Sequence, residues 1–194
     1  VYKRQVRYEF LFQGLAVGTA WLKRAAEEQK PNRLELLYGA SVSPSIDWAW
    51  NFRVRGRTVL ESDTLLPKVA EVTTEKKQRH KRRSTLFDRH RGVARIETWK
   101  SQDDRPHRKE VPLAGDFDIP SAILALSRME NAGMIHVLRA DDRYEVTLAP
   151  GGIREITVPA GRFDAREWEL GVRKLGEEPE DGKPPAQLRV WVDA

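Results

Sequence analysis

Short runs in which apolar and polar residues alternate are the feature that most constrains the fold of this chain. From Val6 to Phe12 (VRYEFLF) every second residue is apolar and most of the residues between them are charged, with Leu11 as the exception. Successive side chains of a β-strand point to opposite faces, so this pattern predicts a strand with one buried face. A second run, residues 19–25, follows after two glycines, and the first 26 residues are therefore predicted to form a β-hairpin.

Similar runs recur along the chain, separated by Gly, Pro, Asn or Asp. Roughly ten short strands with short connections predict an antiparallel sheet that curls or closes, because a long open sheet leaves exposed edges. The expected fold class is mainly β, a curled or barrel-like antiparallel sheet, and 194 residues with 40% hydrophobic content suit a single domain over residues 1–194. Further strands are expected at residues 34–38, 52–54, 93–99, 135–138, 144–148, 153–158, 163–170 and 188–192.

One helix is predicted near residues 118–130. Asp118 suits the N-cap position and Pro120 suits the first turn, while Asn131 and Gly133 are expected to end the helix. Its predicted apolar stripe, spaced i, i+3, i+4 and i+7, consists of Ile119, Ala122, Ile123 and Leu126.

Positive charge is concentrated in one segment, Lys76–Arg91 (KKQRHKRRSTLFDRHR). This segment contains eight Lys or Arg and one Asp, a local charge of +7, whereas the whole chain has a net charge of +5. The other 178 residues therefore carry a net −2. Clustered cations attract anions, so the segment is a candidate site for an anionic lipid headgroup, an acidic polysaccharide or a nucleic acid. The residues predicted to bind the anion are Lys76, Lys77, Arg79, Lys81, Arg82 and Arg83.

A solvated hairpin is the competing interpretation of the same segment. If residues 73–87 form a strand pair, alternation places these side chains in water whether or not a ligand binds them. The stretch Lys76–Thr85 also contains no Phe, Tyr or Trp on which bases can stack. Nucleic-acid binding is thus a weaker expectation than the charge alone suggests.

Sequence motifs for catalysis or metal binding are missing. The chain has no Cys, which excludes thiol catalysis and disulfides, and it has no P-loop, G-x-G-x-x-G or G-x-S-x-G motif. Its four histidines lack H-x-x-x-H or H-E-x-x-H spacing. No catalytic residue, metal or cofactor is therefore predicted.

Four carboxylates keep an enzymatic alternative open, a hydrolase or transferase acting on an envelope glycan. Glu155 shares a strand face with Ile153 and is expected to point inward, within a buried ion pair. Glu167 and Glu169 are expected on a solvent face, opposite Trp168 and Leu170. The candidate acid and base residues are Glu155, Asp164, Glu167 and Glu169.

Aromatic residues offer a third kind of site, a cavity for an apolar or glycan ligand, with ordinary core packing as the alternative. His136 alternates with Met134 and Leu138 and is expected to be a hydrogen-bonded core or cavity residue. The candidate cavity-lining residues are Trp21, Trp48, Trp50 and His136.

Membrane and targeting signals are not apparent. The longest apolar run, Ala122–Leu126, is far shorter than the roughly 20 residues of a spanning helix. The N-terminus lacks the hydrophobic core of a signal peptide, so a targeting peptide is expected to be absent or already removed.

Six short segments occur in an informative order over nearly the whole chain. They are Tyr8–Gly18, Leu66–Pro67, Leu86–Asp88, Asp118–Leu124, Arg154–Glu155 and Val190–Asp193. In this order they resemble the bacterial family catalogued as domain of unknown function 3108. Members of that family are exported, mainly β proteins of Gram-negative envelopes. The resemblance implies a periplasmic location and a β fold, and it implies no catalytic residue.

The leading hypothesis is a periplasmic, non-enzymatic protein that binds a partner or an anionic or amphipathic envelope component. Candidate partners are an anionic lipid, a glycan or an envelope protein. Nucleic-acid binding through Lys76–Arg91 is the weaker alternative.

Overall fold

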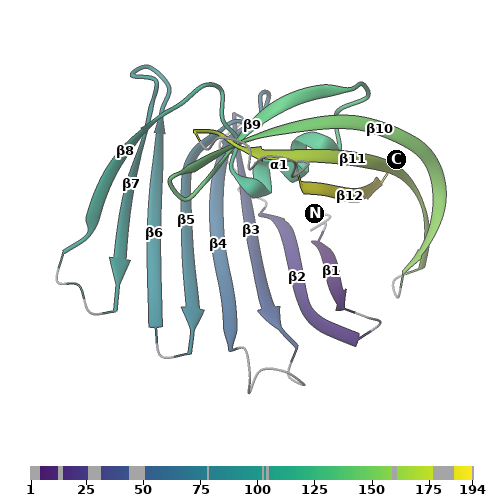
Figure 1. The fold of residues 1–194 in the computed structure, drawn as a ribbon, viewed down its shortest axis with the longest axis horizontal. Helices are drawn as coiled ribbons and strands as arrows, with labels where there is room; N and C mark the ends of the chain where they lie inside the picture. The colour runs from purple at the N-terminus through teal and green to yellow at the C-terminus, as the bar shows by residue number, and fades with distance from the viewer. Residues whose placement is uncertain are drawn as a thin grey trace. The chain divides into compact units, whose positions relative to one another are not determined.

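A computed structural model describes residues 5–12, 15–25, 32–43, 51–77, 79–101, 103, 105–158, 161–176 and 186–193. Within these residues the chain forms twelve β-strands and one α-helix (Figure 1), and neighbouring strands pair antiparallel. The prediction of a mainly β, antiparallel fold with one helix is therefore confirmed.

The chain divides into two compact units, and the first, Val1–Leu113, contains an eight-stranded sheet. Its strands lie side by side in sequence order, so each connection joins neighbours. The prediction of one domain over residues 1–194 concerns both units together and stays a prediction. The strands are β1 (Gln5–Phe12), β2 (Leu15–Ala25), β3 (Arg33–Val42), β4 (Phe52–Glu61), β5 (Pro67–Lys76), β6 (Arg79–Asp88), β7 (Val93–Lys100) and β8 (His107–Pro112).

The predicted N-terminal hairpin is present as the antiparallel pair β1 and β2. The register of this pair shifts between Phe10 and Leu11, the position at which the alternation of the sequence breaks. The extra residue of this β-bulge is Val17, in β2, because Phe10 pairs with Gly18 and Leu11 with Ala16.

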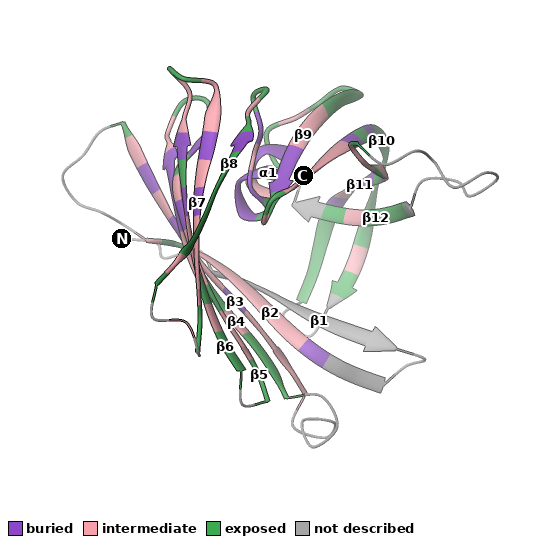
Figure 2. Cartoon of the chain, turned by 60° about the vertical axis from the view of Figure 1, so that its left-hand side comes forward, coloured by how far each residue is buried: buried purple, intermediate pink, exposed green. Residues whose placement is uncertain are grey.

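Strands β4 to β8 of the first unit each contain buried residues towards one end and exposed residues towards the other. In β5 and β6 the buried residues lie towards Pro67 and Phe87, whereas Lys76 and Arg79, at the connecting turn, are exposed (Figure 2). Leu36 and Leu60 belong to the buried end. The buried part of this sheet therefore does not extend to the turn of the basic segment, where Phe52, opposite Lys76, is 37% exposed.

The second unit, Ala114–Ala194, contains a four-stranded sheet and the helix. Its core packs Ala122 and Leu126 of the helix with Val146 and Leu148, around the almost fully buried Trp168. The elements are α1 (Ile119–Leu126), β9 (Gly133–Arg139), β10 (Asp142–Val158), β11 (Gly161–Lys174) and β12 (Ala186–Asp193), with strand order β12-β11-β10-β9.

The helix begins as the sequence predicts but is shorter. Asp118 is the N-cap: its Oδ1 accepts a hydrogen bond from the Ser121 N–H at 3.0 Å, and Ser121 Oγ accepts one from the Asp118 N–H at 3.0 Å. The helix ends at Leu126, not near residue 130. Among the described residues no helix is long and apolar enough to cross a membrane.

The predicted apolar stripe of the helix is partly wrong. Ile119 is 47% exposed, and the buried side of the helix instead includes Ala125. Because the capping box holds Ser121 inside, the residues one, four and five positions later turn towards the core, and the first helical residue turns away. The buried helical residues are Pro120, Ser121, Ala122, Ala125 and Leu126.

Candidate anion-binding face

The register of the eight-stranded sheet assigns each strand residue to one of two faces, because directly paired residues of an antiparallel sheet share a face. We call these faces A and B. One row of face A consists of Leu36, Thr58, Ala70, Thr85 and Ile96, and one row of face B consists of Leu37, Arg57, Glu71, Ser84 and Glu97.

The basic segment lies largely on the predicted hairpin. β5 and β6 pair with Lys76 directly opposite Arg79, and Lys77 in the turn has a φ of +55°. The hairpin predicted over residues 73–87 is thus confirmed. Whether its cations bind an anion is a separate question, and that assignment stays a prediction.

The strand register does not place all six predicted anion-binding residues on the same face of the sheet. Four of them, Lys76, Arg79, Lys81 and Arg83, lie on face A, where the first two are exposed and the other two half-buried. Lys77 lies in the turn. The cluster on face A is therefore smaller than the sequence segment.

The sixth residue, Arg82, lies on face B. Its Nη2 donates a hydrogen bond to Glu71 Oε1 at 3.4 Å, and its guanidinium carbon lies 5.6 Å from the centre of the Trp99 ring. A stacked, ion-paired arginine of this kind already has partners within the sheet. Arg82 consequently does not belong with the cations of face A.

Two neighbouring strands add cations to face A that the sequence analysis missed. Lys100 on β7 lies directly opposite Lys81, and Lys109 on β8 lies opposite Ile96. His107 is also on this face, and its Nε2 lies 3.2 Å from Oδ2 of the loop residue Asp103. Only strand pairing brings these residues to the hairpin, so no local sequence signal could have identified them.

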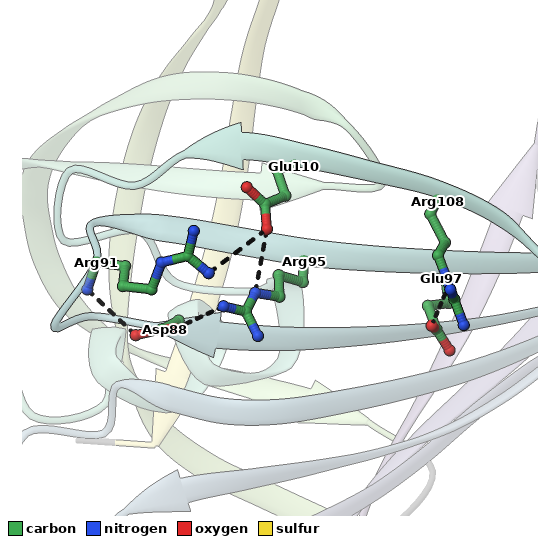
Figure 3. A network of polar contacts seen from close by, with 6 residues as sticks. All are labelled: Asp88, Arg91, Arg95, Glu97, Arg108 and Glu110. Carbon is green, nitrogen blue, oxygen red and sulfur yellow. Dashed lines mark hydrogen bonds and ion pairs between the residues drawn. The ribbon is translucent and has the colours of Figure 1, made fainter.

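The carboxylates of β4–β8 lie on the face opposite to this cluster of cations. Throughout β4–β8, every strand position of which is described, each Asp or Glu lies on face B. Each of these carboxylates also lies within 4.0 Å of a side-chain nitrogen of a Lys, Arg or His, and Figure 3 shows the part of this network around Arg95. The pairs are Glu61 with Lys68, Glu71 with Arg82, Glu75 with His80, Asp88 with Arg95, Glu97 with Arg108, and Glu110 with Arg95.

Uncharged residues border the cations on face A. Val72 lies opposite Arg83, and Thr74, in the same row as Val54, lies opposite Lys81; Val54 and Val72 are both half-buried. The Tyr38 ring lies directly on Gly56, where a Cβ atom would clash with it. Face A therefore combines a cationic corner with an adjoining apolar strip, the arrangement expected for a surface that binds an amphiphile.

The four candidate cavity-lining residues do not form a described site. Trp21 lies on face B of the first unit, where its indole covers Gly39 with atoms 2.7–2.9 Å from a Cβ position. His136 belongs to the second unit, and its Nδ1 lies 3.3 Å from the Ala114 carbonyl oxygen, in line with the hydrogen-bonded role predicted for it. Trp48 and Trp50 lie outside the described residues. The cavity-lining role stays a prediction.

The inward orientation predicted for Glu155 is wrong. Its side chain is 58% exposed and its Oε1 lies 3.6 Å from Arg162 Nη1. The reason is that β9 pairs with β10 only as far as Leu148, so residue 155 lies on a part of the β10–β11 hairpin beyond that pairing.

The orientation of Glu167 and Glu169 is confirmed, because the residues that alternate with them, Trp168 and Leu170, are buried. Glu167 Oε2 lies 2.6 Å from Arg154 Nη2 and its Oε1 lies 3.6 Å from Arg189 Nε. Glu169 Oε1 lies 3.3 Å from Arg189 Nη2. Both carboxylates thus belong to surface ion pairs. Asp164 is exposed, and the described residues contain no group of three or more His, Asp or Glu able to hold a metal ion.

The two antiparallel sheets define a mainly β class of protein, and a solved structure has a similar fold. The structure described as "Beta-barrel-like Protein of Domain of Unknown Function DUF1849 from Brucella abortus" is similar, with a TM-score of 0.60 and 9% sequence identity over 97% of this chain and 85% of that chain. The chain belongs to the family described as Protein of unknown function (DUF3108), which matches residues 5–194. This confirms the family predicted from the sequence. No curated protein matches the chain.

Proposed function

We propose that this protein is a periplasmic, non-enzymatic envelope protein that binds an anionic amphiphile on face A of its eight-stranded sheet. The observation that carries the proposal is the separation of charge between the two faces of β4–β8. Face B balances its cations with six carboxylates, whereas the strand positions of face A contain cations and uncharged residues only.

Charge separation of this kind costs free energy of folding. Like charges directly opposite each other destabilise an antiparallel pair, and Lys76 and Arg79 form such a pair on face A. Unfavourable local arrangements that persist in a fold are most frequent at functional sites. An anion bound at this corner would offset the repulsion.

The apolar strip beside the cations favours an amphiphile over a nucleic acid. Val54 and Val72 offer aliphatic surface, and the two aromatic residues beside them on face A, Tyr38 and Phe52, are fewer than a series of stacked bases needs. A hydrocarbon chain placed there removes apolar surface from water while the headgroup remains at the cations. Face A thus offers contacts to both the headgroup and the hydrocarbon chain of an anionic amphiphile.

Isothermal titration calorimetry with short-chain lipids below their micelle-forming concentrations tests this function. Dihexanoyl phosphatidic acid is expected to bind, whereas zwitterionic dihexanoyl phosphatidylcholine is expected to bind at least about tenfold more weakly, since each tenfold corresponds to about 1.4 kcal/mol. Equal affinity for the two lipids, or binding of single-stranded DNA in preference to either, would contradict the proposal.

A pair of double variants locates the site. Lys81→Gln with Lys100→Gln removes two charges from β6 and β7 on face A, and Arg82→Gln with Arg95→Gln removes two from the same strands on face B. The first double variant is expected to lose phosphatidic acid binding and the second to retain it.

The periplasmic location is tested in cells. Osmotic-shock fractionation followed by immunoblotting is expected to recover the native protein with periplasmic marker proteins. Recovery with cytoplasmic markers would contradict this part of the proposal.

A further inference from the structure

At the exposed end of β4–β6, an aromatic side chain lies next to a row of cations on face A (Figure 2). Phe52 of β4 is 37% exposed and lies directly opposite Lys76 of β5. Lys76 in turn lies directly opposite Arg79 of β6, and the connecting turn adds a third exposed cation, Lys77. We call these four residues the tip of the sheet.

The positive charge of the tip is not balanced within the described part of the chain. There, no carboxylate oxygen lies within ion-pair distance of Lys76, Lys77 or Arg79. Glu75, next to Lys76 in the sequence, lies on face B, where its Oε1 is 4.0 Å from His80 Nδ1. The tip therefore presents three positive charges to its surroundings.

A second exposed phenylalanine, Phe163 in the second unit, has different neighbours. It is 41% exposed, and the Nη1 atom of the adjacent Arg162 lies 3.6 Å from Glu155 Oε1. A single exposed apolar residue is ordinary on a protein surface. Phe52 is distinguished by its row of cations, and Phe163 is its matched control.

An apolar side chain among Lys and Arg residues is typical of a surface that lies at the interface of an anionic membrane. The ring enters the boundary between headgroups and acyl chains, and the cations remain at the phosphates. Each Lys or Arg near such a surface contributes about fivefold to the affinity, so three contribute about hundredfold. A nucleic acid offers the same negative charge but no apolar layer for Phe52 to enter.

We propose that the tip docks this protein onto the surface of an anionic phospholipid bilayer. Phe52 inserts below the headgroups, while Lys76, Lys77 and Arg79 contact their phosphates. The inference goes beyond the proposed function, because it concerns an intact bilayer at the end of the sheet and not a single amphiphile along face A.

Vesicle flotation of the full chain tests the docking. The protein is expected to bind vesicles of equal parts phosphatidylglycerol and phosphatidylcholine at least about tenfold more tightly than vesicles of phosphatidylcholine alone. Phe52→Ser is expected to weaken binding to the anionic vesicles at least about fivefold, because its ring no longer leaves water. Phe163→Ser is expected to leave binding unchanged.

A pair of double variants tests the cations. Lys76→Gln with Arg79→Gln is expected to weaken binding to the anionic vesicles at least about tenfold, whereas Arg82→Gln with Arg95→Gln, on face B, changes it less than about threefold. Thermal unfolding of each variant identifies any loss of fold.

A fluorescent label measures insertion. Because the chain contains no Cys, a single introduced cysteine alone takes the label. Phe52→Cys labelled with the fluorophore NBD is expected to shift its emission to shorter wavelength on the anionic vesicles and to be quenched by lipids spin-labelled on the acyl chain. Thr73→Cys, exposed on face B of β5, is expected to show neither change.

The outcomes separate this inference from the proposed function. Equal binding to both kinds of vesicle, or equal losses for Phe52→Ser and Phe163→Ser, would overturn docking through the tip. No vesicle binding, together with binding of dihexanoyl phosphatidic acid, would overturn the inference and leave the proposed function standing. Vesicle binding through the tip without binding of dihexanoyl phosphatidic acid would support the inference and contradict the proposed function.

Discussion

The two faces of the eight-stranded sheet contain the same kinds of cation but surround them differently. On face B, Arg95 lies within ion-pair distance of both Asp88 and Glu110, and Arg108 within 2.8 Å of Glu97. On face A, Lys81 is paired in register with Lys100. Alternating positions of the same strands thus place ion pairs on one face and a concentration of positive charge on the other. The comparison shows that the net charge of a segment says little until strand register assigns each residue to a face.

The largest expected change in the free energy of unfolding comes from a substitution that places a cation in the buried end of face A. Ile96 is 3% exposed and lies on the same face as Lys100. Ile96→Lys is expected to lower the free energy of unfolding by about 3–5 kcal/mol, because it places an uncompensated charge in the core. Urea denaturation measures the change.

The matched control for Ile96→Lys is Thr98→Lys, two residues along the same strand and half-buried. It is expected to change the free energy of unfolding by no more than about 1 kcal/mol. Similar losses for both variants would contradict the division of face A into a buried end and a cationic corner.

Charge reversal on each face is expected to produce opposite effects on stability. Lys76→Glu converts the like-charge pair with Arg79 into an opposite-charge pair and is expected to raise the free energy of unfolding by about 0.5–1 kcal/mol. Glu97→Lys places a cation opposite Arg108 and is expected to lower it by a similar amount. A loss of stability in both variants would contradict the difference between like-charge pairs on face A and ion pairs on face B.

Raising the salt concentration is expected to reduce both the stability gain from charge reversal on face A and the stability loss from charge reversal on face B. This is the smallest of the expected effects. Raising the salt concentration from about 0.1 M to 1 M shortens the Debye length from about 10 Å to 3 Å and screens both attraction and repulsion. The stability gain of Lys76→Glu and the stability loss of Glu97→Lys should therefore both shrink. Thermal unfolding at the two salt concentrations tests this, and salt-independent differences would point to packing instead of charge.

The sequence predicted the strands with one apolar face, because burial on one side produces alternation. It missed β8, where only Val111 is buried and the other side chains are exposed. It also predicted two strands at residues 144–148 and 153–158 where β10 is continuous. Pro150 and the two glycines after it produce a register shift in the pairing with β11 but do not end the strand.

Prediction of the candidate site was limited for a different reason. The segment from Lys76 to Arg83 was found because its cations are contiguous in the sequence. Lys100 lies on another strand, and Arg82, within the segment, faces the other way. Register depends on pairing across the whole sheet, which a single stretch of sequence does not reveal.

The central claim is that face A retains its opposed cations in order to bind an anionic amphiphile. The most direct test is one calorimetric titration of dihexanoyl phosphatidic acid into two double variants, Lys81→Gln with Lys100→Gln and Arg82→Gln with Arg95→Gln, alongside the unaltered protein. We expect at least about tenfold weaker binding in the first variant and unchanged binding in the second. Equal affinity in both variants would contradict the claim.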